Sequence, residues 1–256
     1  MSRVADRVRP RLTKSRFASR PLDDKPASMP PYNHPALTEA RTIYPSTVRG
    51  GRDRWALKSG ENSAKIGGLI MKGRWTGFPV YTLTLEERAT CPTSCHHWRS
   101  CYGNRMQYAD RVAAGPDLEW RLAREVALLA AYHPHGFVVR LHILGDFYSV
   151  DYVALWRQLL ERHPALHIFG YTARWQEGDP TAAALMALVR DQWERFAIRF
   201  SNAPADSARP ATISIEHPLQ CPTDAIVCPE QIGLTESCST CALCWGSQRR
   251  VAFIQH

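Results

Sequence analysis

The stretch Phe137-Val-Val-Arg-Leu-His-Ile-Leu144, followed at once by Gly145-Asp146-Phe147, decides the fold. Its β-branched and apolar residues predict a buried strand, and the glycine ends that strand abruptly. Val150–Arg162 is predicted to be a helix with Ser149 as its cap. Leu166–Thr172 predicts another strand. Because a strand, a helix and a strand joined by short connections form a βαβ unit, we expect these two strands to be parallel.

The same alternation continues in both directions along the chain. Further strands are expected at Phe78–Leu85, Phe196–Phe200 and Ala211–Ile215, and further helices at Asp117–Tyr132 and Thr181–Trp193. The chain has 256 residues, of which 45% are hydrophobic, and this is enough to bury the core of one large domain. We therefore expect an α/β fold built on a parallel sheet, which is either open or curled into a barrel.

Polar residues follow several of the predicted strands. Gly145-Asp146, Thr172 and Ser201-Asn202 each stand at a strand end, and a long loop follows Phe78–Leu85. Parallel strands place their carboxyl ends on one edge of the sheet, where ligands bind in both barrels and open sheets. These residues are therefore predicted to converge although they are far apart in the sequence.

Eight cysteines form two groups along the chain. The members are Cys91, Cys95 and Cys101, and then Cys221, Cys228, Cys238, Cys241 and Cys244. Disulfide frameworks are typical of shorter secreted chains, whereas the first twenty residues here lack the apolar run of an export signal. We therefore expect a cytoplasmic protein whose thiols bind a metal or an iron–sulfur cluster.

The first group has the spacing C-x3-C-x5-C and lies on the loop after the first predicted strand. Three thiolates from one short loop can hold one face of a [4Fe-4S] cluster and leave one iron without a cysteine from that loop. A small molecule can coordinate at such an open iron. Zinc is the alternative metal, with His96 or His97 as a fourth ligand.

The second group includes the run Cys228-x9-Cys238-x2-Cys241-x2-Cys244. This run resembles loops of ferredoxin type, although zinc ribbons also use C-x2-C pairs. Cys221 leaves two interpretations open. It is either a spectator, in which case the first cluster is open, or the fourth ligand that closes the first cluster.

The net charge of +8 comes from the N-terminal part of the chain. Residues 1–60 contain 13 Lys and Arg against 5 Asp and Glu, while the rest of the chain is balanced. We expect a basic, largely irregular arm over 1–52, an α/β cluster-binding domain over 53–216 and a cysteine-rich metal-binding extension over 217–256. The arm is either a nucleic-acid contact or a solvated tail. No run of 18 apolar residues exists, so no membrane-spanning helix is expected.

Four motifs resemble a known family. They are Thr82-Leu-Thr-Leu-Glu-Glu-Arg-Ala-Thr-Cys-Pro-Thr-Ser-Cys95, Cys101-Tyr-Gly-Asn104, Leu144-Gly-Asp-Phe-Tyr-Ser149 and Cys238-x2-Cys241-x2-Cys244-Trp245. Together they resemble the phage gene product 88 family. More broadly, a strand, a three-cysteine loop and a strand that ends in Gly145-Asp146-Phe147 resemble the radical SAM superfamily.

The broader resemblance implies a partial (β/α) barrel that binds a four-iron cluster through Cys91, Cys95 and Cys101. It also implies that the open iron chelates S-adenosylmethionine, which is then cleaved to a 5′-deoxyadenosyl radical. Further cofactor-binding residues implied by position are Gly145, Asp146, Phe147, Thr172, Arg174, Ser201 and Asn202. A glycine permits close approach of a ligand, and a carboxylate suits an ammonium group.

These observations support three hypotheses of function. The first is an iron–sulfur enzyme of radical SAM-like architecture, with one or two clusters, that modifies nucleic acid or another phage or bacterial substrate. The second is a non-catalytic nucleic-acid-binding module with two structural metal sites. The third is a redox carrier or sensor, which requires an electron donor as partner.

Overall fold

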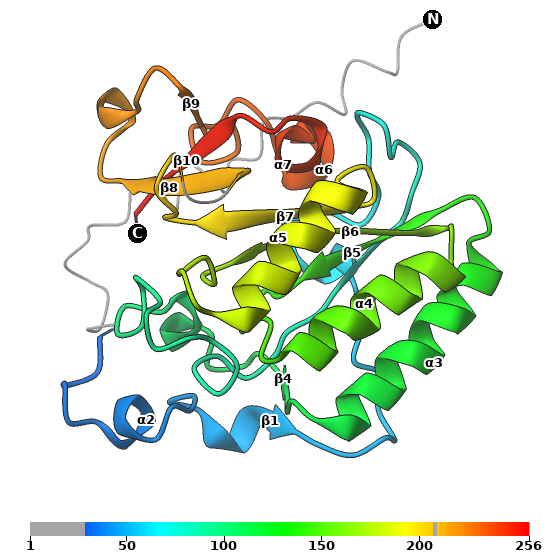
Figure 1. Cartoon of the computed structure of the whole chain (residues 1–256), viewed down its shortest axis with the longest axis horizontal. Coiled ribbons are helices and arrows are strands. Elements are labelled where there is room, and N and C mark those ends of the chain that lie inside the picture. Colours follow the sequence, from blue (N-terminus) through cyan, green and yellow to red (C-terminus); the bar gives the residue numbers. More distant parts are fainter. Residues whose placement is uncertain (1–28, 207–208, 256) are drawn as a thin grey trace, which may run out of the picture.

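The computed structural model describes residues 29–206 and 209–255, and its main element is an eight-stranded sheet (Figure 1). Every neighbouring pair of strands in this sheet is parallel except β2 and β3. In spatial order the strands are β2 (Lys58–Ser59), β3 (Val80–Thr82), β5 (Phe137–Leu141), β6 (Leu166–Thr172), β7 (Phe196–Ser201), β8 (Ala211–Ile215), β10 (Arg250–Ile254) and β9 (Ala225–Val227). The predicted α/β fold with a parallel sheet is thus confirmed.

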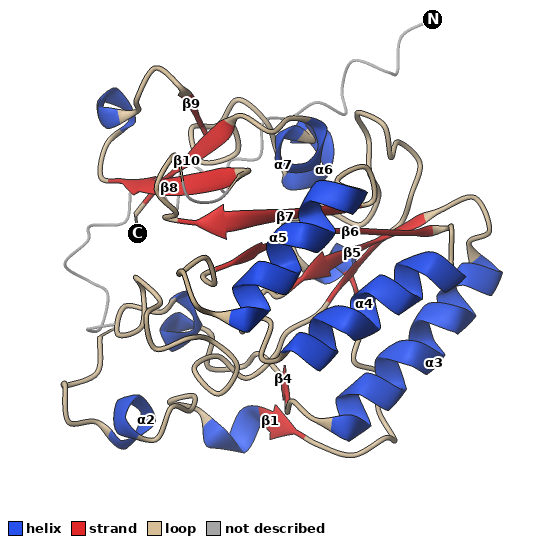
Figure 2. Ribbon diagram, viewed as in Figure 1, coloured by secondary structure: helices blue, strands red, loops and turns tan. Residues whose placement is uncertain are grey.

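Three long helices cover one face of the sheet (Figure 2). They are α3 (Pro116–Tyr132), α4 (Val150–Arg162) and α5 (Pro180–Gln192). The shorter helices are α2 (Pro35–Thr38), α6 (Cys238–Cys241) and α7 (Leu243–Gly246), with 3-10 turns η3 (Pro45–Thr47), η4 (Gly60–Asn62), η5 (Tyr102–Arg105) and η6 (Pro218–Gln220). A separate parallel pair joins β1 (Val48–Arg49) to β4 (Arg111–Val112).

Helix α4 shows why these segments fold as predicted. The Ser149 side chain accepts a hydrogen bond from the Tyr152 backbone N–H at 3.1 Å, which satisfies one of the free donors at the helix start. Residues at helical spacing, among them Val153, Trp156 and Leu160, are buried. The helix therefore has a cap at its start and an apolar stripe that faces the sheet.

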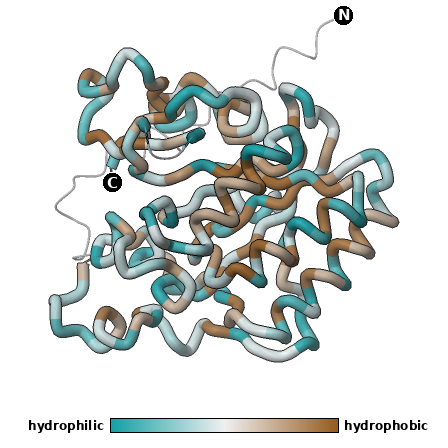
Figure 3. The backbone as a smooth tube through the Cα atoms, viewed as in Figure 1, coloured by the Kyte–Doolittle hydropathy of each residue, from teal (hydrophilic) through white to brown (hydrophobic). Residues whose placement is uncertain are grey.

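The opposite face of the sheet is covered by the C-terminal segment. Phe169 on β6 packs against Trp245, with ring centroids 4.6 Å apart. Trp245 in turn stacks on Trp75, at 5.4 Å and an interplanar angle of 7°. Hydropathy along the chain follows this layering, because the brown, hydrophobic stretches of Figure 3 gather on the central strands and on the helix faces that meet them.

The sheet is open in the described part of the chain, since β2 and β9 form its two edges and no pairing joins them. Residues 217–256 do not simply extend from the domain, because they supply β9 and β10 to the same sheet. Strand β10 inserts between β8 and β9, and neither β9 nor β10 was expected from the sequence. No described helix is both long and apolar enough to cross a membrane.

The predicted N-terminal arm lies partly outside the described residues. Residues 1–28 are not described, whereas 29–52 contain α2, η3 and β1. Strand β1 pairs with β4, directly after the loop that carries the first cysteines. The described part of the arm is therefore attached to the body of the protein. The three predicted domain boundaries stay predictions.

Candidate functional site

The loops that follow β3, β5 and β6 meet at the carboxyl edge of the sheet. Oδ1 of Asp146, after β5, accepts a hydrogen bond from the Thr172 hydroxyl at 2.7 Å, and Oδ2 accepts one from the Ala173 backbone N–H at 2.7 Å. The Asp146 backbone N–H donates to Thr90 Oγ1 at 3.1 Å. Since Thr90 directly precedes Cys91, the structure brings the three predicted loops together.

Asp146 acts as a clamp between these loops. The carboxylate is buried, and burial is the main reason that its pKa is raised to about 6, against the opposing effect of its hydrogen bonds. Arg174 lies alongside, where it donates to the carbonyl of Phe147 and to Asp179 at 2.9 Å. The protein contacts of these residues hold the edge together, and their implied roles toward S-adenosylmethionine stay predictions.

Gly145 has a backbone conformation and a packing environment that favour glycine. Its φ is +86°, and a Cβ at this position would lie 2.6 Å from both Leu85 Cβ and Thr90 Oγ1. Gly145 also lines a cavity of about 340 Å³, which we call the first cavity. The turn after β5 therefore lies close to the cysteine loop and still leaves room for a ligand.

The first thiol group consists of Cys91, Cys95 and Cys101, and two of its members border the first cavity. Cys91 and Cys101 line it, together with Lys65, His97, Arg105 and Ser214 among others. Burial raises the pKa of all three thiols, to about 11 at Cys95 and well above the usual range at Cys91. Cys95 and Cys101 add to the increase at Cys91, so the three sulfur atoms are electrostatic neighbours.

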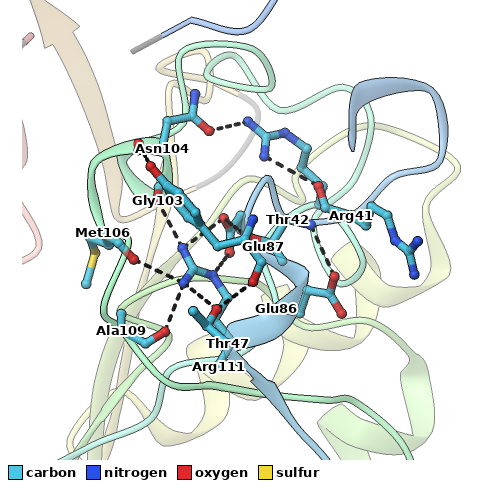
Figure 4. A network of polar contacts seen from close by, with 12 residues as sticks. Arg41, Thr42, Thr47, Glu86, Glu87, Gly103, Asn104, Met106, Ala109 and Arg111 are labelled. Atoms are coloured by element: carbon cyan, nitrogen blue, oxygen red, sulfur yellow. Dashed lines mark hydrogen bonds and ion pairs between the residues drawn. The ribbon is translucent and has the colours of Figure 1, made fainter. Parts of the chain in front are cut away.

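A buried ion pair fixes the loop that carries these thiols (Figure 4). Arg111 Nε donates to Glu87 at 2.6 Å, and neither side chain is exposed to solvent. Arg111 also donates to the carbonyl of Gly103 at 3.0 Å, two residues after Cys101. Thr42 Oγ1 donates to Glu87 at 2.8 Å, which ties in the N-terminal segment. The loop is thus held from the inside and from the N-terminal side.

A second contact pair closes the same loop. Arg88 donates to Asn104 Oδ1 at 2.6 Å and to the carbonyl of Trp98 at 2.9 Å. Asn104 donates back to the carbonyl of Arg99 at 2.8 Å. From the sequence, Glu87, Arg88 and Asn104 were expected only as parts of the motifs that resemble the family. Their position on either side of the cysteines was the one sign that they shape the cysteine loop.

The C-terminal thiol group, Cys228, Cys238, Cys241 and Cys244, lines a second cavity of about 210 Å³. Arg140 on β5 and Tyr171 on β6 line the same cavity. The Tyr171 hydroxyl donates to Cys244 Sγ at 2.9 Å. Burial raises the pKa of Cys228 to about 11 and that of Cys238 to about 12. Four thiols and one guanidinium therefore share a single enclosure.

Backbone contacts fix this cysteine segment against the sheet. The Cys238 N–H donates to the Lys65 carbonyl at 2.8 Å, and the Ser239 N–H donates to Ile66 at 3.0 Å. From the other side, the buried Arg199 on β7 donates to the carbonyl of Cys244 at 2.9 Å and to that of Arg249 at 2.8 Å. The segment is thus attached both to the sheet and to the stretch before β3.

The two cavities adjoin each other. Lys65, Tyr102, Ile143 and Phe253 line both of them. Tyr102 directly follows Cys101, and Phe253 belongs to β10. The two cysteine groups, separated by more than a hundred residues in sequence, therefore lie on either side of a common wall.

The remaining predicted site residues have other surroundings. Cys221 lines neither cavity, and it packs against a small apolar cluster that includes Ile215 and Ala225. Asn202 Oδ1 accepts a hydrogen bond from the Ser214 N–H at 2.7 Å, and Ser201 pairs in register with Thr212. These two residues link β7 to β8.

The histidines beside the first thiol group do not join its cysteines around a position for one metal ion. His97 Nε2 lies 3.3 Å from Ser214 Oγ, and its Nδ1 lies 3.1 Å from Ser100 Oγ. Across residues 29–206 and 209–255, no three His, Cys, Asp or Glu side chains are grouped around a position for one metal ion. Six of the eight thiols line the two cavities instead.

Comparison with known proteins adds one relationship. No curated protein and no solved structure matches the chain. A family model described as Gene product 88 matches residues 54–247, a span that contains all eight cysteines and most of the residues that line the two cavities. The chain therefore belongs to the phage Gene product 88 family.

Proposed function

We propose that this protein is an iron–sulfur enzyme with two adjoining cluster sites at the carboxyl edge of its sheet. One observation carries the proposal: six cysteines from two distant parts of the chain line two cavities that share a wall. Cys95, the remaining member of the first thiol group, is an electrostatic neighbour of Cys101. Cys221 lines neither cavity and packs against the apolar cluster of Ile215 and Ala225 instead.

The donor set at the second cavity suits a [4Fe-4S] cluster. Such clusters are held by four cysteine thiolates, and this cavity has four. Its volume of about 210 Å³ is far more than the roughly 15 Å³ that admits one water. Zinc, the alternative metal, draws its sulfur ligands to about 2.3 Å from one point. Thiols arranged around a larger space favour the cluster over the single ion.

The first cavity suits an open cluster with a small-molecule ligand beside it. Its thiol group has three members, and its volume of about 340 Å³ lies in the range of small-molecule sites. Gly145 permits close approach of a ligand, while Lys65 and Arg105 supply positive charge for a carboxylate. The ligand we propose is S-adenosylmethionine, to which a cluster held by Cys91, Cys95 and Cys101 would supply one electron.

The chain's own residues prepare this site in three ways. Asp146 fixes the loops after β5 and β6 through its contacts with Thr172 and Ala173. The ion pair between Glu87 and Arg111 fixes the cysteine loop. Ser214 and His97 connect that loop to β8. The substrate class we propose is nucleic acid, since the charge excess lies in the N-terminal part of the chain.

Metal analysis of anaerobically purified protein tests the proposal. Two clusters require about eight irons and eight sulfides per chain, from the four-iron stoichiometry of each. Two zinc ions per chain without sulfide would instead support the structural metal module. If the clusters form, adding S-adenosylmethionine to the reduced protein should change its electron paramagnetic resonance spectrum and yield 5′-deoxyadenosine. An unchanged spectrum and no such product would leave a redox carrier.

A further inference from the structure

Arg140 places an unneutralised cation in the second cavity. Its guanidinium lies 4.7 Å from the centre of the Tyr171 ring and 5.6 Å from that of Phe169. It donates to the backbone carbonyls of Leu141 and His142, both at the end of its own strand. Among the described residues, no Asp or Glu forms an ion pair with Arg140.

Arg140 is half-buried, and even partial burial of a cation without a counter-ion has a desolvation cost, so its position needs an explanation. Arg199 on β7 also contacts the C-terminal segment, and its carbonyl partners there explain its burial. Arg140 has fewer such partners and faces the thiols. Burial lowers the pKa of Arg140, and Tyr171, Cys238 and Cys244 act against that decrease. Tyr171 and the four thiols line the same cavity as Arg140, whereas Glu230, the carboxylate of that cavity, pairs with Lys65 at 3.5 Å.

We propose that Arg140 is the counter-charge of the C-terminal thiol site and raises the reduction potential of the cluster bound there. This inference rests on the proposed function. Four thiolates and an iron–sulfur core form an anion, and each one-electron reduction by an external donor adds one more negative charge. A nearby cation stabilises the reduced form more than the oxidised form.

Tyr171 contributes in the same direction. Its hydroxyl donates to Cys244 Sγ at 2.9 Å, and hydrogen bonds to cluster sulfurs are one of the factors that set the potential. Tyr171 also contacts the guanidinium of Arg140 through its ring, so the same side chain contacts both the sulfur and the cation. Arg140 and Tyr171 would thus both favour the reduced form of the cluster, one through its charge and the other through its hydrogen bond.

Redox titration of the second cluster alone tests this inference. The background is the full chain with Cys91, Cys95 and Cys101 each changed to Ser, which removes the first cluster. In Arg140→Gln, the ratio of reduced to oxidised cluster at a fixed solution potential should fall about tenfold. For a one-electron couple this corresponds to a midpoint about 59 mV lower. Tyr171→Phe should give a smaller decrease.

Two matched variants separate charge from fold. Arg140→Lys keeps the positive charge. Its ratio of reduced to oxidised cluster should therefore lie within about threefold of that of the background chain with Arg140. Arg157→Gln changes an arginine on α4, on the opposite face of the sheet, and should not shift the midpoint. Loss of the cluster from Arg140→Gln but not from Arg140→Lys also supports the inference.

Two results would overturn it. One is an unchanged midpoint in Arg140→Gln, and the other is equal loss of the cluster from the Gln and Lys variants. Failure of the proposed function has a different signature. In that case the background chain with Arg140 intact binds no iron and sulfide at the second cavity.

Discussion

Glu87 and Arg111 form an ion pair 2.6 Å long in which both side chains are fully buried. Glu87 lies at the start of the first cysteine loop and Arg111 lies at its end, in β4. The pair therefore closes the loop that carries Cys91, Cys95 and Cys101. Additional hydrogen bonds satisfy both partners, which is the condition under which a buried pair is tolerated.

Glu87→Gln should destabilise the protein strongly. Breaking a buried pair leaves the Arg111 charge without compensation, which costs about 3–5 kcal/mol. The free energy of unfolding, measured by urea denaturation, checks this value. Because the same pair shapes the cysteine loop, this variant should also lose iron from the first site before it loses iron from the second.

Glu39→Gln is the matched control for that variant. Glu39 pairs with Arg41 at 3.2 Å, but both side chains are more than half exposed. Exposed pairs contribute about 1 kcal/mol or less. Equal losses of stability in Glu39→Gln and Glu87→Gln would contradict the role assigned to the buried pair.

The regular elements were predictable because their signals are local. Helix α4 has its cap and its apolar stripe within one short segment, and the prediction of Val150–Arg162 is confirmed. Strand β10 was missed because its place between β8 and β9 depends on pairing with residues far away in the sequence. Its sequence Arg250-Val-Ala-Phe-Ile254 is short and lies just after the cysteine segment, which dominates the local pattern.

The sequence was enough to predict which residues gather at the carboxyl edge of the sheet, but not what surrounds them. Spacing alone identified the two cysteine groups and the strand ends that meet near Asp146. The common wall between the cavities and the unpaired cation of Arg140 arise only when β5, β6 and the C-terminal segment pack together. No local pattern marks an arginine inside a strand as the neighbour of a thiol a hundred residues later.

Replacing cysteines one at a time should divide them into two classes. Cys238→Ser should remove about four irons per chain, because it takes a ligand from a four-iron cluster. Cys221→Ser should remove none, since Cys221 lies outside the first cysteine loop, lines neither cavity and packs against the apolar cluster of Ile215 and Ala225. Iron and sulfide analysis of the anaerobic proteins checks both. Loss of iron in Cys221→Ser would show instead that this thiol closes the first cluster.

Gly145→Ala should be costly for two reasons. The positive φ of +86° disfavours any residue with a Cβ, by about 1–2 kcal/mol. The new Cβ would also collide with Leu85 and Thr90, and overpacking of this kind adds about 1–3 kcal/mol. We expect reduced stability and a cysteine loop that is displaced from the first cavity.

Gly178→Ala separates these two contributions. Gly178 has a similar φ of +83°, but a Cβ there meets nothing within 4 Å. It should therefore show the backbone cost alone, of about 1–2 kcal/mol. Urea denaturation of both variants provides the comparison, and equal losses would mean that the contact of Gly145 with the cysteine loop is unimportant.

Removing residues 1–28 should weaken any binding to nucleic acid while leaving the two sites intact. These residues contain 8 Lys and Arg but 3 Asp and Glu. Fewer phosphate contacts reduce both the affinity and its dependence on salt. Titration of a fluorescent oligonucleotide at several salt concentrations measures both quantities. The deletion stops before Thr42, which contacts Glu87, so iron content should not change. An unchanged salt dependence would exclude this segment as the contact.

His142 should make the protein sensitive to acid. It is buried after β5, its Nε2 lies 3.2 Å from the Tyr152 hydroxyl, and burial together with Arg140 lowers its pKa to about 3. The usual value of 6.5 applies in the unfolded chain. Between pH 6.5 and about 3 the unfolded chain therefore binds a proton that the folded protein excludes. The free energy of unfolding should fall as the pH decreases through this window, by about 1.4 kcal/mol per pKa unit.

A pair of variants isolates this contribution. Tyr152→Phe keeps His142, whereas the double variant His142→Phe with Tyr152→Phe removes the titrating group and leaves no hydroxyl without its partner. The phenyl ring at position 142 preserves the edge contact with Phe147, whose centroid lies 4.7 Å away. Urea denaturation between pH 7 and 4 should show a steeper loss of stability in the single variant, because the carboxylate contributions are common to both. Parallel curves would mean that His142 takes up its proton as readily in the folded protein as in the unfolded chain.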